Sequence, residues 1–281
     1  MSFKNIFKCW FLFFIMGEVI GILSLKGGVG KTTSALCLGD ALSCFGKKIL
    51  IIDGNLSAPN LGLHLNIEGI EKGKGLHDVL SGSCNAEDVI IELDNFDLLP
   101  SAIFNEKNFT PLALRNKIKS LKRKYDYIII DSSPSLDEET LAVMLASDQL
   151  LVVTTPDHLT LGTTIKAMKI AKQRGTHISG MILNRVYKKG FELSIKDIEE
   201  TSGVNVLAVI PHTYKIPESI SVFKPYTSHK SRDTGSEEFK RLAATLSGLK
   251  YRPMRLKRIL RWANPEKQEV NRQIFYERVF G

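Results

Sequence analysis

The chain has 281 residues, a formal net charge of +8 and an isoelectric point near 9.2. Its hydrophobic share of 43% and charged share of 24% are those of a folded globular protein, which excludes collagen-like, disordered and disulfide-scaffold classes for most of the chain. The positive balance indicates an acidic partner, either nucleic acid or an anionic membrane surface. None of the four cysteines forms a C-x-x-C pair, so the sequence shows no zinc or iron–sulfur ligand set and fits a reduced cytoplasmic protein.

Residues 1–15 contain Lys4 and Lys8, and an apolar run extends from Cys9 to Met16. The run is too short to span a bilayer, which takes about 20 apolar residues, and no small-residue cleavage site follows it. Two interpretations stay open. We favour an upstream extension, with Met16 as the natural start; the alternative is a short leader that touches the membrane.

From residue 17 to about residue 250, apolar β-rich segments alternate with segments of helical periodicity. Strands are predicted at 19–25, 48–53, 97–100, 127–131, 149–155, 179–183 and 205–210. Helices are predicted near 31–45, 111–124, 137–146, 162–174, 194–202 and 235–247. Strands that are apolar throughout and separated by helices indicate an α/β fold, a mostly parallel twisted sheet with helices on both faces. Ligands of such sheets bind at the carboxyl ends of the strands.

The segment between the first predicted strand and the first predicted helix is rich in glycine. It reads Lys26-Gly27-Gly28-Val29-Gly30-Lys31-Thr32-Thr33. Glycines let consecutive backbone N–H groups point into one concavity that cradles phosphate oxygens, and the helix that follows adds its positive N-terminal end. Lys31 would place an ammonium on the β- and γ-phosphates, and Thr32 would offer its hydroxyl to Mg²⁺. The segment therefore predicts a binding site for ATP and Mg²⁺.

This loop departs from the ordinary G-x-x-x-x-G-K-[ST] pattern, because Leu25 takes the place of the first glycine and Lys26 follows it. It resembles the deviant Walker A loop of the MinD/ParA family, whose fold is that of the P-loop nucleotide hydrolases. The resemblance implies an ATP hydrolase that forms an ATP-dependent homodimer, in which Lys26 reaches across to the partner's phosphates. A second cation near the γ-phosphate would stabilise the charge that develops there.

Two further segments resemble family motifs in the same order. Asp53 ends the second predicted strand, and residues 54–61 follow it as the family's switch segment does. Asp131 ends another apolar strand and precedes Pro134, which resembles the Walker B aspartate and the second switch. The resemblance implies that Asp131 and Pro134 help bind the nucleotide, and that Thr32, Asp53 and Asp131 hold the Mg²⁺ shell.

The base-binding residues implied by the resemblance lie further along the chain. Asn184 and Arg185 directly follow the strand predicted at 179–183. The matching asparagine of the family reads adenine, because its amide offers both a donor and an acceptor to the edge of the base. Pro211 ends the next strand and would help to wall the base pocket.

One departure from the family concerns hydrolysis. The second aspartate of the family's Asp-x-Asp motif is Asn55 here, and by resemblance it joins Lys26, Lys31 and Asp53 as the catalytic residues. Asparagine can hydrogen-bond the attacking water but cannot accept its proton. We therefore predict tight ATP binding and slow hydrolysis. The alternative is that Asn55 is neutral, because Asp53 or another residue orients the water.

The net charge is unevenly distributed over a predicted extension (1–15), an ATPase domain (16–250) and a basic tail (251–281). The extension carries +2, the domain has 28 basic against 27 acidic residues, and the tail carries +5.

In the tail, Pro253 suits the first turn of a helix with one apolar face, formed by Leu256, Ile259, Leu260 and Ala263. Basic residues lie on the opposite face and Trp262 lies near the margin, a pattern that suits an anionic membrane surface. The alternative is a terminal helix that docks on the parent domain.

These features favour a MinD-like switch that positions cell division or another structure. It would be cytoplasmic, peripheral at the inner face of the cell membrane, and served by an activating or cargo protein. The alternative is a ParA-like partition ATPase that binds DNA, which the near-neutral domain makes the weaker candidate. Metal-cluster carriers and nitrogenase-type reductases are excluded, because both rely on cysteine pairs.

Overall fold

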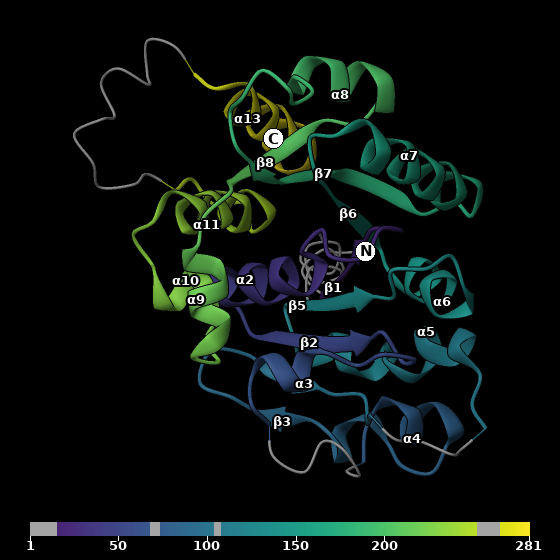
Figure 1. Cartoon of the computed structure of the whole chain (residues 1–281). Helices are drawn as coiled ribbons and strands as arrows, with labels where there is room; N and C mark the ends of the chain where they lie inside the picture. The colour runs from purple at the N-terminus through teal and green to yellow at the C-terminus, as the bar shows by residue number, and fades with distance from the viewer. Residues whose placement is uncertain (1–15, 68–73, 104–107, 252–264) are drawn as a thin grey trace, which may run out of the picture.

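The computed structural model describes residues 16–67, 74–103, 108–251 and 265–281, which form one central sheet covered by helices (Figure 1). The sheet has eight strands in the order β3-β4-β2-β5-β1-β6-β7-β8. The strands are β1 (Glu18–Leu23), β2 (Ile49–Gly54), β3 (Ile91–Glu92), β4 (Asp97–Leu99), β5 (Tyr127–Ser132), β6 (Gln149–Thr154), β7 (His177–Val186) and β8 (Val206–Pro211). Every neighbouring pair is parallel except β3 and β4. This confirms the predicted α/β fold.

Most of the helices fall between the strands in chain order. The α-helices are α2 (Lys31–Ser43), α3 (Leu61–His64), α4 (Leu76–Ser81), α5 (Leu114–Lys117), α6 (Glu138–Ala146), α7 (His158–Gln173), α8 (Ile195–Ser202), α9 (Lys215–Ser221), α10 (Tyr226–His229), α11 (Thr234–Leu246) and α13 (Lys267–Phe280). Of these, α9, α10, α11 and α13 follow β8. Short 3₁₀ helices are η1 (Ala86–Asp88), η2 (Pro111–Ala113) and η3 (Lys119–Arg123). None of the helices in the described part of the chain is long and apolar enough to cross a membrane.

The two faces of the sheet carry different helices. Alternate residues of a strand point to opposite faces, so Ile20 of β1 packs in the cluster beneath α2 and α11, whereas Val19 packs in the cluster beneath α4 and α6. A third cluster, beneath α7 and α8, joins Leu150 of β6 to Ala167. Figure 1 shows α2 and α11 on one side of the sheet and α6 and α7 on the other. Burial on both faces explains why the strands are apolar throughout.

The seven predicted strands agree with the structure, but one predicted helix is interrupted, and one strand and several helices (α3, α4, α9, α10 and α13) were not predicted. The helix predicted over 111–124 is broken into η2, α5 and η3, since these segments end and restart within a few residues. The short strand β3, which pairs antiparallel with β4 at the sheet edge, was not predicted. Two residues are too few to show the alternation that identifies a strand. The basic amphipathic helix predicted from Pro253 lies outside the described residues.

Helix α13 covers the outer edge of β8, the last strand in the sheet (Figure 1). Asn271 donates its amide to the carbonyl oxygen of Val206 at 2.8 Å, and Arg272 donates to the carbonyl oxygen of Leu207 at 2.6 Å. Both side chains are buried. On an uncovered edge strand, such backbone carbonyl oxygens would be available for pairing with another chain. By occupying them, α13 protects the edge. The end of the tail therefore packs on the domain, through a helix that lies further along the chain than the one predicted from Pro253.

Candidate functional site

The glycine-rich phosphate loop (residues 24–30) connects β1 to α2 at the carboxyl edge of the sheet. Gly28 and Gly30 have φ values of +74° and +97°, in the left-handed region that side chains other than glycine rarely adopt. A Cβ atom on Gly30 would lie 2.3 Å from the amide nitrogen of Asn184, which leaves no room for a side chain. Both conformation and space therefore require glycine at position 30.

Lys31 and Thr32 open α2 and converge on Asp131 at the end of β5. The Thr32 hydroxyl donates to Asp131 Oδ2 at 2.5 Å. Burial lowers the pKa of Lys31, and the neighbouring charge of Asp131 partly opposes this. Burial also raises the pKa of Asp131 to about 6, against the effects of the Thr32 hydrogen bond and the Lys31 charge. The structure thus gathers three of the predicted site residues from two elements that are about 100 residues apart in the chain.

These residues fit a magnesium ion. Asp131 Oδ1 is buried and has no hydrogen-bond partner among the described residues, so one acceptor is left over where a cation or its water shell would bind. A carboxylate oxygen and a threonine hydroxyl are ligands that Mg²⁺ takes together with phosphate oxygens and water. Within the described residues there is no group of three or more His, Cys, Asp or Glu side chains that would form a protein-only metal site.

Asp53 lies beside Asp131 in the sheet, since the two residues are partners in the β2–β5 pairing. Burial, with a further contribution from the Asp131 charge, raises the pKa of Asp53 to about 7. Its carboxylate accepts backbone N–H groups from Asn55, Asn60 and Leu61 at 3.3, 3.0 and 2.9 Å. The side chain that we predicted for catalysis and metal binding thereby also organises the β2 loop (residues 55–60).

Asn55 begins the β2 loop, and its side chain folds back onto that loop. The amide nitrogen donates to the carbonyl oxygen of Ala58 at 2.6 Å. The amide oxygen is buried without a partner among the described residues. The side chain therefore holds its own loop with its donor and keeps one acceptor for a water molecule.

The predicted base-binding residues lie at the ends of β7 and β8. Asn184 is buried, and its amide nitrogen donates to the carbonyl oxygen of Val29 in the phosphate loop at 2.7 Å. Arg185 follows with an exposed side chain and a φ of +56°, and Pro211 ends β8 half-buried. Pro134 is half-buried in the β5 loop (residues 133–137). The structure thus brings Asn184 against the phosphate loop.

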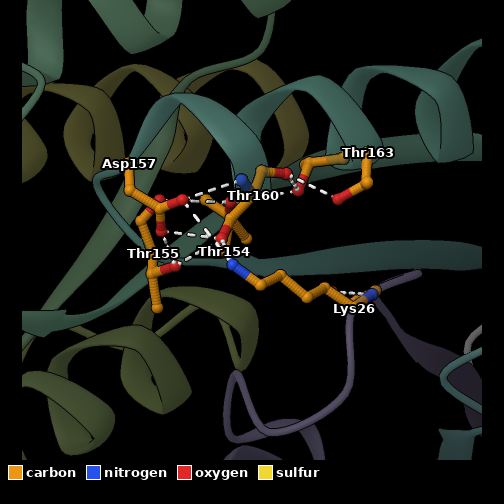
Figure 2. Close-up of polar contacts among 8 residues, drawn as sticks. Lys26, Thr154, Thr155, Asp157, Thr160 and Thr163 are labelled. Atoms are coloured by element: carbon orange, nitrogen blue, oxygen red, sulfur yellow. Dashed lines mark hydrogen bonds and ion pairs between the residues drawn. The ribbon is translucent and has the colours of Figure 1, made fainter.

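Lys26 contacts its own chain rather than the centre of the phosphate loop (Figure 2). Its ammonium donates to the Thr160 hydroxyl at 2.6 Å and lies 3.6 Å from Asp157 Oδ1. Although partial burial raises the pKa of Asp157, hydrogen bonds from Thr155 and Thr160 and the charge of Lys26 bring it down to about 2. Asp157 also caps α7 by accepting the Thr160 N–H at 2.8 Å. The sequence did not indicate Asp157 and Thr160 as site residues, although Asp157 is a favoured N-cap residue directly before a helix.

Comparison with known proteins identifies the family. A family model described as an AAA domain matches residues 17–174. The chain is 30% identical over 243 residues to the septum site-determining protein MinD of Thermotoga maritima, covering 83% of this chain and 89% of that protein. It is 31% identical over 248 residues to the chromosome partitioning protein ParA of Caulobacter vibrioides, covering 80% and 92%. The solved structure of MinD complexed with Mg-ADP from Pyrococcus horikoshii superposes with a TM-score of 0.77 at 35% identity, covering 82% and 96%. The chain belongs to the MinD/ParA family of ATPases.

Proposed function

We propose that this protein is a MinD-like molecular switch that dimerises with ATP, hydrolyses it slowly to ADP and then separates. The observation that carries the proposal is the convergence of Lys31 and Thr32 on Asp131, whose second oxygen is buried without a partner among the described residues. A solved relative holds Mg-ADP, which supports the same ligands here.

The residues of the site have distinct tasks in this proposal. The backbone of the phosphate loop binds the phosphates, and Lys31 neutralises the charge on their β- and γ-oxygens. Thr32 and Asp131 would hold Mg²⁺, and the ion would neutralise negative charge on the phosphates. Asn184, Arg185 and Pro211 would surround the base.

Lys26 would act on the partner subunit. In a dimer closed over two nucleotides, its ammonium would leave Thr160 and Asp157 and reach the partner's phosphates. A cation placed there stabilises the charge that develops on the γ-phosphate during hydrolysis. This would make hydrolysis depend on dimerisation.

We further propose that the protein works at a membrane. The tail carries a net +5, and five of its basic residues lie in the segment 252–264, which contains no acidic residue. Each basic residue near an anionic surface contributes about 1 kcal/mol to binding. The protein would then be cytoplasmic and peripheral at the inner face of the cell membrane, where it positions division or another structure with the help of an activating or cargo protein.

Light scattering tests the switch directly. The mass of the wild-type protein is measured with Mg-ADP and with Mg-ATP, and the measurement is repeated with Lys26→Ala. We expect a dimer for the wild type with ATP, a monomer with ADP, and a monomer for Lys26→Ala with either nucleotide. A wild-type protein that stays monomeric with ATP contradicts the proposal.

The membrane step needs a variant that leaves α13 in place, because truncation after residue 250 would also uncover the edge of β8. Replacing Arg255, Lys257 and Arg258 by Gln removes three charges and should weaken ATP-dependent binding to anionic vesicles about a hundredfold. Equal pelleting of the two proteins would exclude this membrane contact. Retention on DNA with steep salt dependence, unaffected by the three changes, would favour the ParA-like function.

A further inference from the structure

Glu139, near the start of α6, accepts two hydrogen bonds from the β2 loop. Its carboxylate accepts the backbone N–H of Leu56 at 3.0 Å and the hydroxyl of Ser57. The Glu139 side chain is buried, 8% exposed. A buried carboxylate is stable only where hydrogen bonds replace its water, so these two contacts are built into the fold.

The bond to Leu56 bears directly on Asn55. The Leu56 N–H belongs to the peptide unit that follows the Asn55 Cα, so fixing that group fixes the orientation of the backbone at Asn55. The carbonyl oxygen of Leu56 also lies 3.2 Å from His77 Nε2, which must therefore be the donor. Together with the Asn55 bond to Ala58, these contacts set where the unpartnered amide oxygen of Asn55 lies.

The first turn of α6, which carries Glu139, is hydrogen-bonded to the β5 loop, and this loop follows β5 and Asp131. Asp137, the cap of α6, accepts the Thr140 N–H at 2.9 Å and the Ser133 hydroxyl at 2.9 Å. The Thr140 hydroxyl donates to the carbonyl oxygen of Ser133 at 3.2 Å. These hydrogen bonds connect the β5 loop directly to the turn of α6 that carries Glu139.

We propose that Glu139 is a positioning residue for hydrolysis, one that couples the β5 loop to the orientation of Asn55 in the β2 loop. This inference rests on the proposed ATPase function, together with the predictions that Pro134 of the β5 loop helps bind the nucleotide and that Asn55 hydrogen-bonds the attacking water. Glu139 touches neither the nucleotide nor the water. Because it acts on the geometry of the reacting complex, it affects the rate of hydrolysis more than the affinity for ATP.

The kinetic test compares Glu139→Ala with Glu139→Gln. We expect Glu139→Ala to lower the single-turnover rate of ATP hydrolysis about tenfold, the usual effect of losing hydrogen bonds to a charged group, with the ATP Kd changed less than about twofold. Glu139→Gln keeps an acceptor for Leu56 and an amide for the Ser57 oxygen, so it should retain most of the rate. Glu138→Ala is the matched control, since Glu138 lies in the same turn and is exposed.

Two kinetic outcomes would overturn the inference. One is a Glu139→Ala variant that hydrolyses ATP at the wild-type rate. The other is an ATP affinity that falls in parallel with the rate, since that pattern marks a residue needed only for folding of the site.

A second measurement does not depend on turnover. Hydrogen–deuterium exchange of residues 55–60 is compared with and without Mg-ATP. We expect ATP to slow exchange there about tenfold in the wild type and to have no such effect in Glu139→Ala, because the link to the β5 loop is lost. Equal ATP protection in both proteins contradicts the inference. A wild type that protects the loop but never hydrolyses ATP would refute the proposed ATPase activity and leave the coupling supported.

Discussion

The ammonium of Lys26 lies 2.6 Å from the hydroxyl oxygen of Thr160, at the N-terminus of α7 (Figure 2). The Lys26 side chain is 41% exposed, and its ion pair with Asp157 is similarly open to water. Pairs of this kind contribute less than about 1 kcal/mol. The lysine proposed to cross the dimer is therefore held within its own chain, weakly enough to be exchanged for a phosphate.

Removing the Thr160 hydroxyl should favour the dimer. In Thr160→Val, Lys26 loses a contact that competes with the partner's phosphates, so the protein concentration at half-dimerisation with ATP should fall about fivefold. Thr163→Val is the control, because the Thr163 hydroxyl donates to the carbonyl oxygen of Thr160 on the same helix. A midpoint that is unchanged, or that shifts equally in both variants, contradicts the competition. Analytical ultracentrifugation over a concentration series measures it.

The Asp157 cap predicts a dependence of stability on pH. Hydrogen bonds from Thr155 and Thr160 lower the pKa of Asp157 in the folded protein to about 2, below its ordinary value of 3.8, although partial burial opposes them. The folded state then favours the ionised form, so its contribution is present above pH 4 and is lost as the pH falls toward 2. Asp157→Asn should lower the free energy of unfolding by about 1 kcal/mol or less at pH 7, and by less at pH 3. Urea unfolding of both proteins at both pH values measures this. If the carboxylate contributes nothing, the difference in unfolding free energy between wild type and Asp157→Asn will be the same at pH 7 and pH 3.

Thr32→Ala should make nucleotide binding insensitive to magnesium. The wild type is expected to bind a fluorescent ATP analogue at least tenfold more weakly when EDTA removes Mg²⁺, because the Thr32 hydroxyl and Asp131 then lose their shared cation. Thr32→Ala should bind weakly with and without EDTA. Ser43→Ala, at the opposite end of α2, is the control. An EDTA effect of equal size in Thr32→Ala would show that Thr32 holds no magnesium.

Asn55→Asp should raise turnover about tenfold or more, since a carboxylate can accept the proton of the attacking water. The change also replaces the donor that now faces the Ala58 carbonyl oxygen at 2.6 Å, so the β2 loop should exchange hydrogen faster. The two effects are separated by measuring single-turnover hydrolysis and loop exchange on the same protein. A rate equal to or below that of the wild type means that Asn55 does not limit hydrolysis.

Arg272 anchors α13, and its loss should destabilise the whole domain. Its guanidinium is 6% exposed and donates to Glu238 Oε2 at 3.0 Å as well as to the Leu207 carbonyl oxygen at 2.6 Å. Arg272→Ala removes a buried partner and should cost about 3 kcal/mol in urea unfolding. Arg278→Ala, an exposed position on the same helix, should cost less than about 0.5 kcal/mol. Similar values for the two variants would show that α13 adds little to stability.

The family and the sheet could be predicted because their signals are local. Gly30, Lys31 and Thr32 stand in one short segment, and each strand carries its own run of apolar residues between helical segments. Asp53 and Asp131 could be placed at one edge, since the carboxyl ends of parallel strands meet there. The break of the helix predicted at 111–124 shows the limit, because helical periodicity does not reveal where the chain turns.

The sequence alone determined that this chain folds as a MinD/ParA-type ATPase with a phosphate loop between its first strand and helix. Only the tertiary structure decided what surrounds that loop. Three hydrogen-bonded pairs illustrate this. Lys26 and Thr160 are 134 positions apart in the chain, Ser57 and Glu139 are 82 apart, and Asn271 and Val206 are 65 apart. No local pattern marks such pairs, because the contacts exist only once strands and helices have packed and brought distant side chains together.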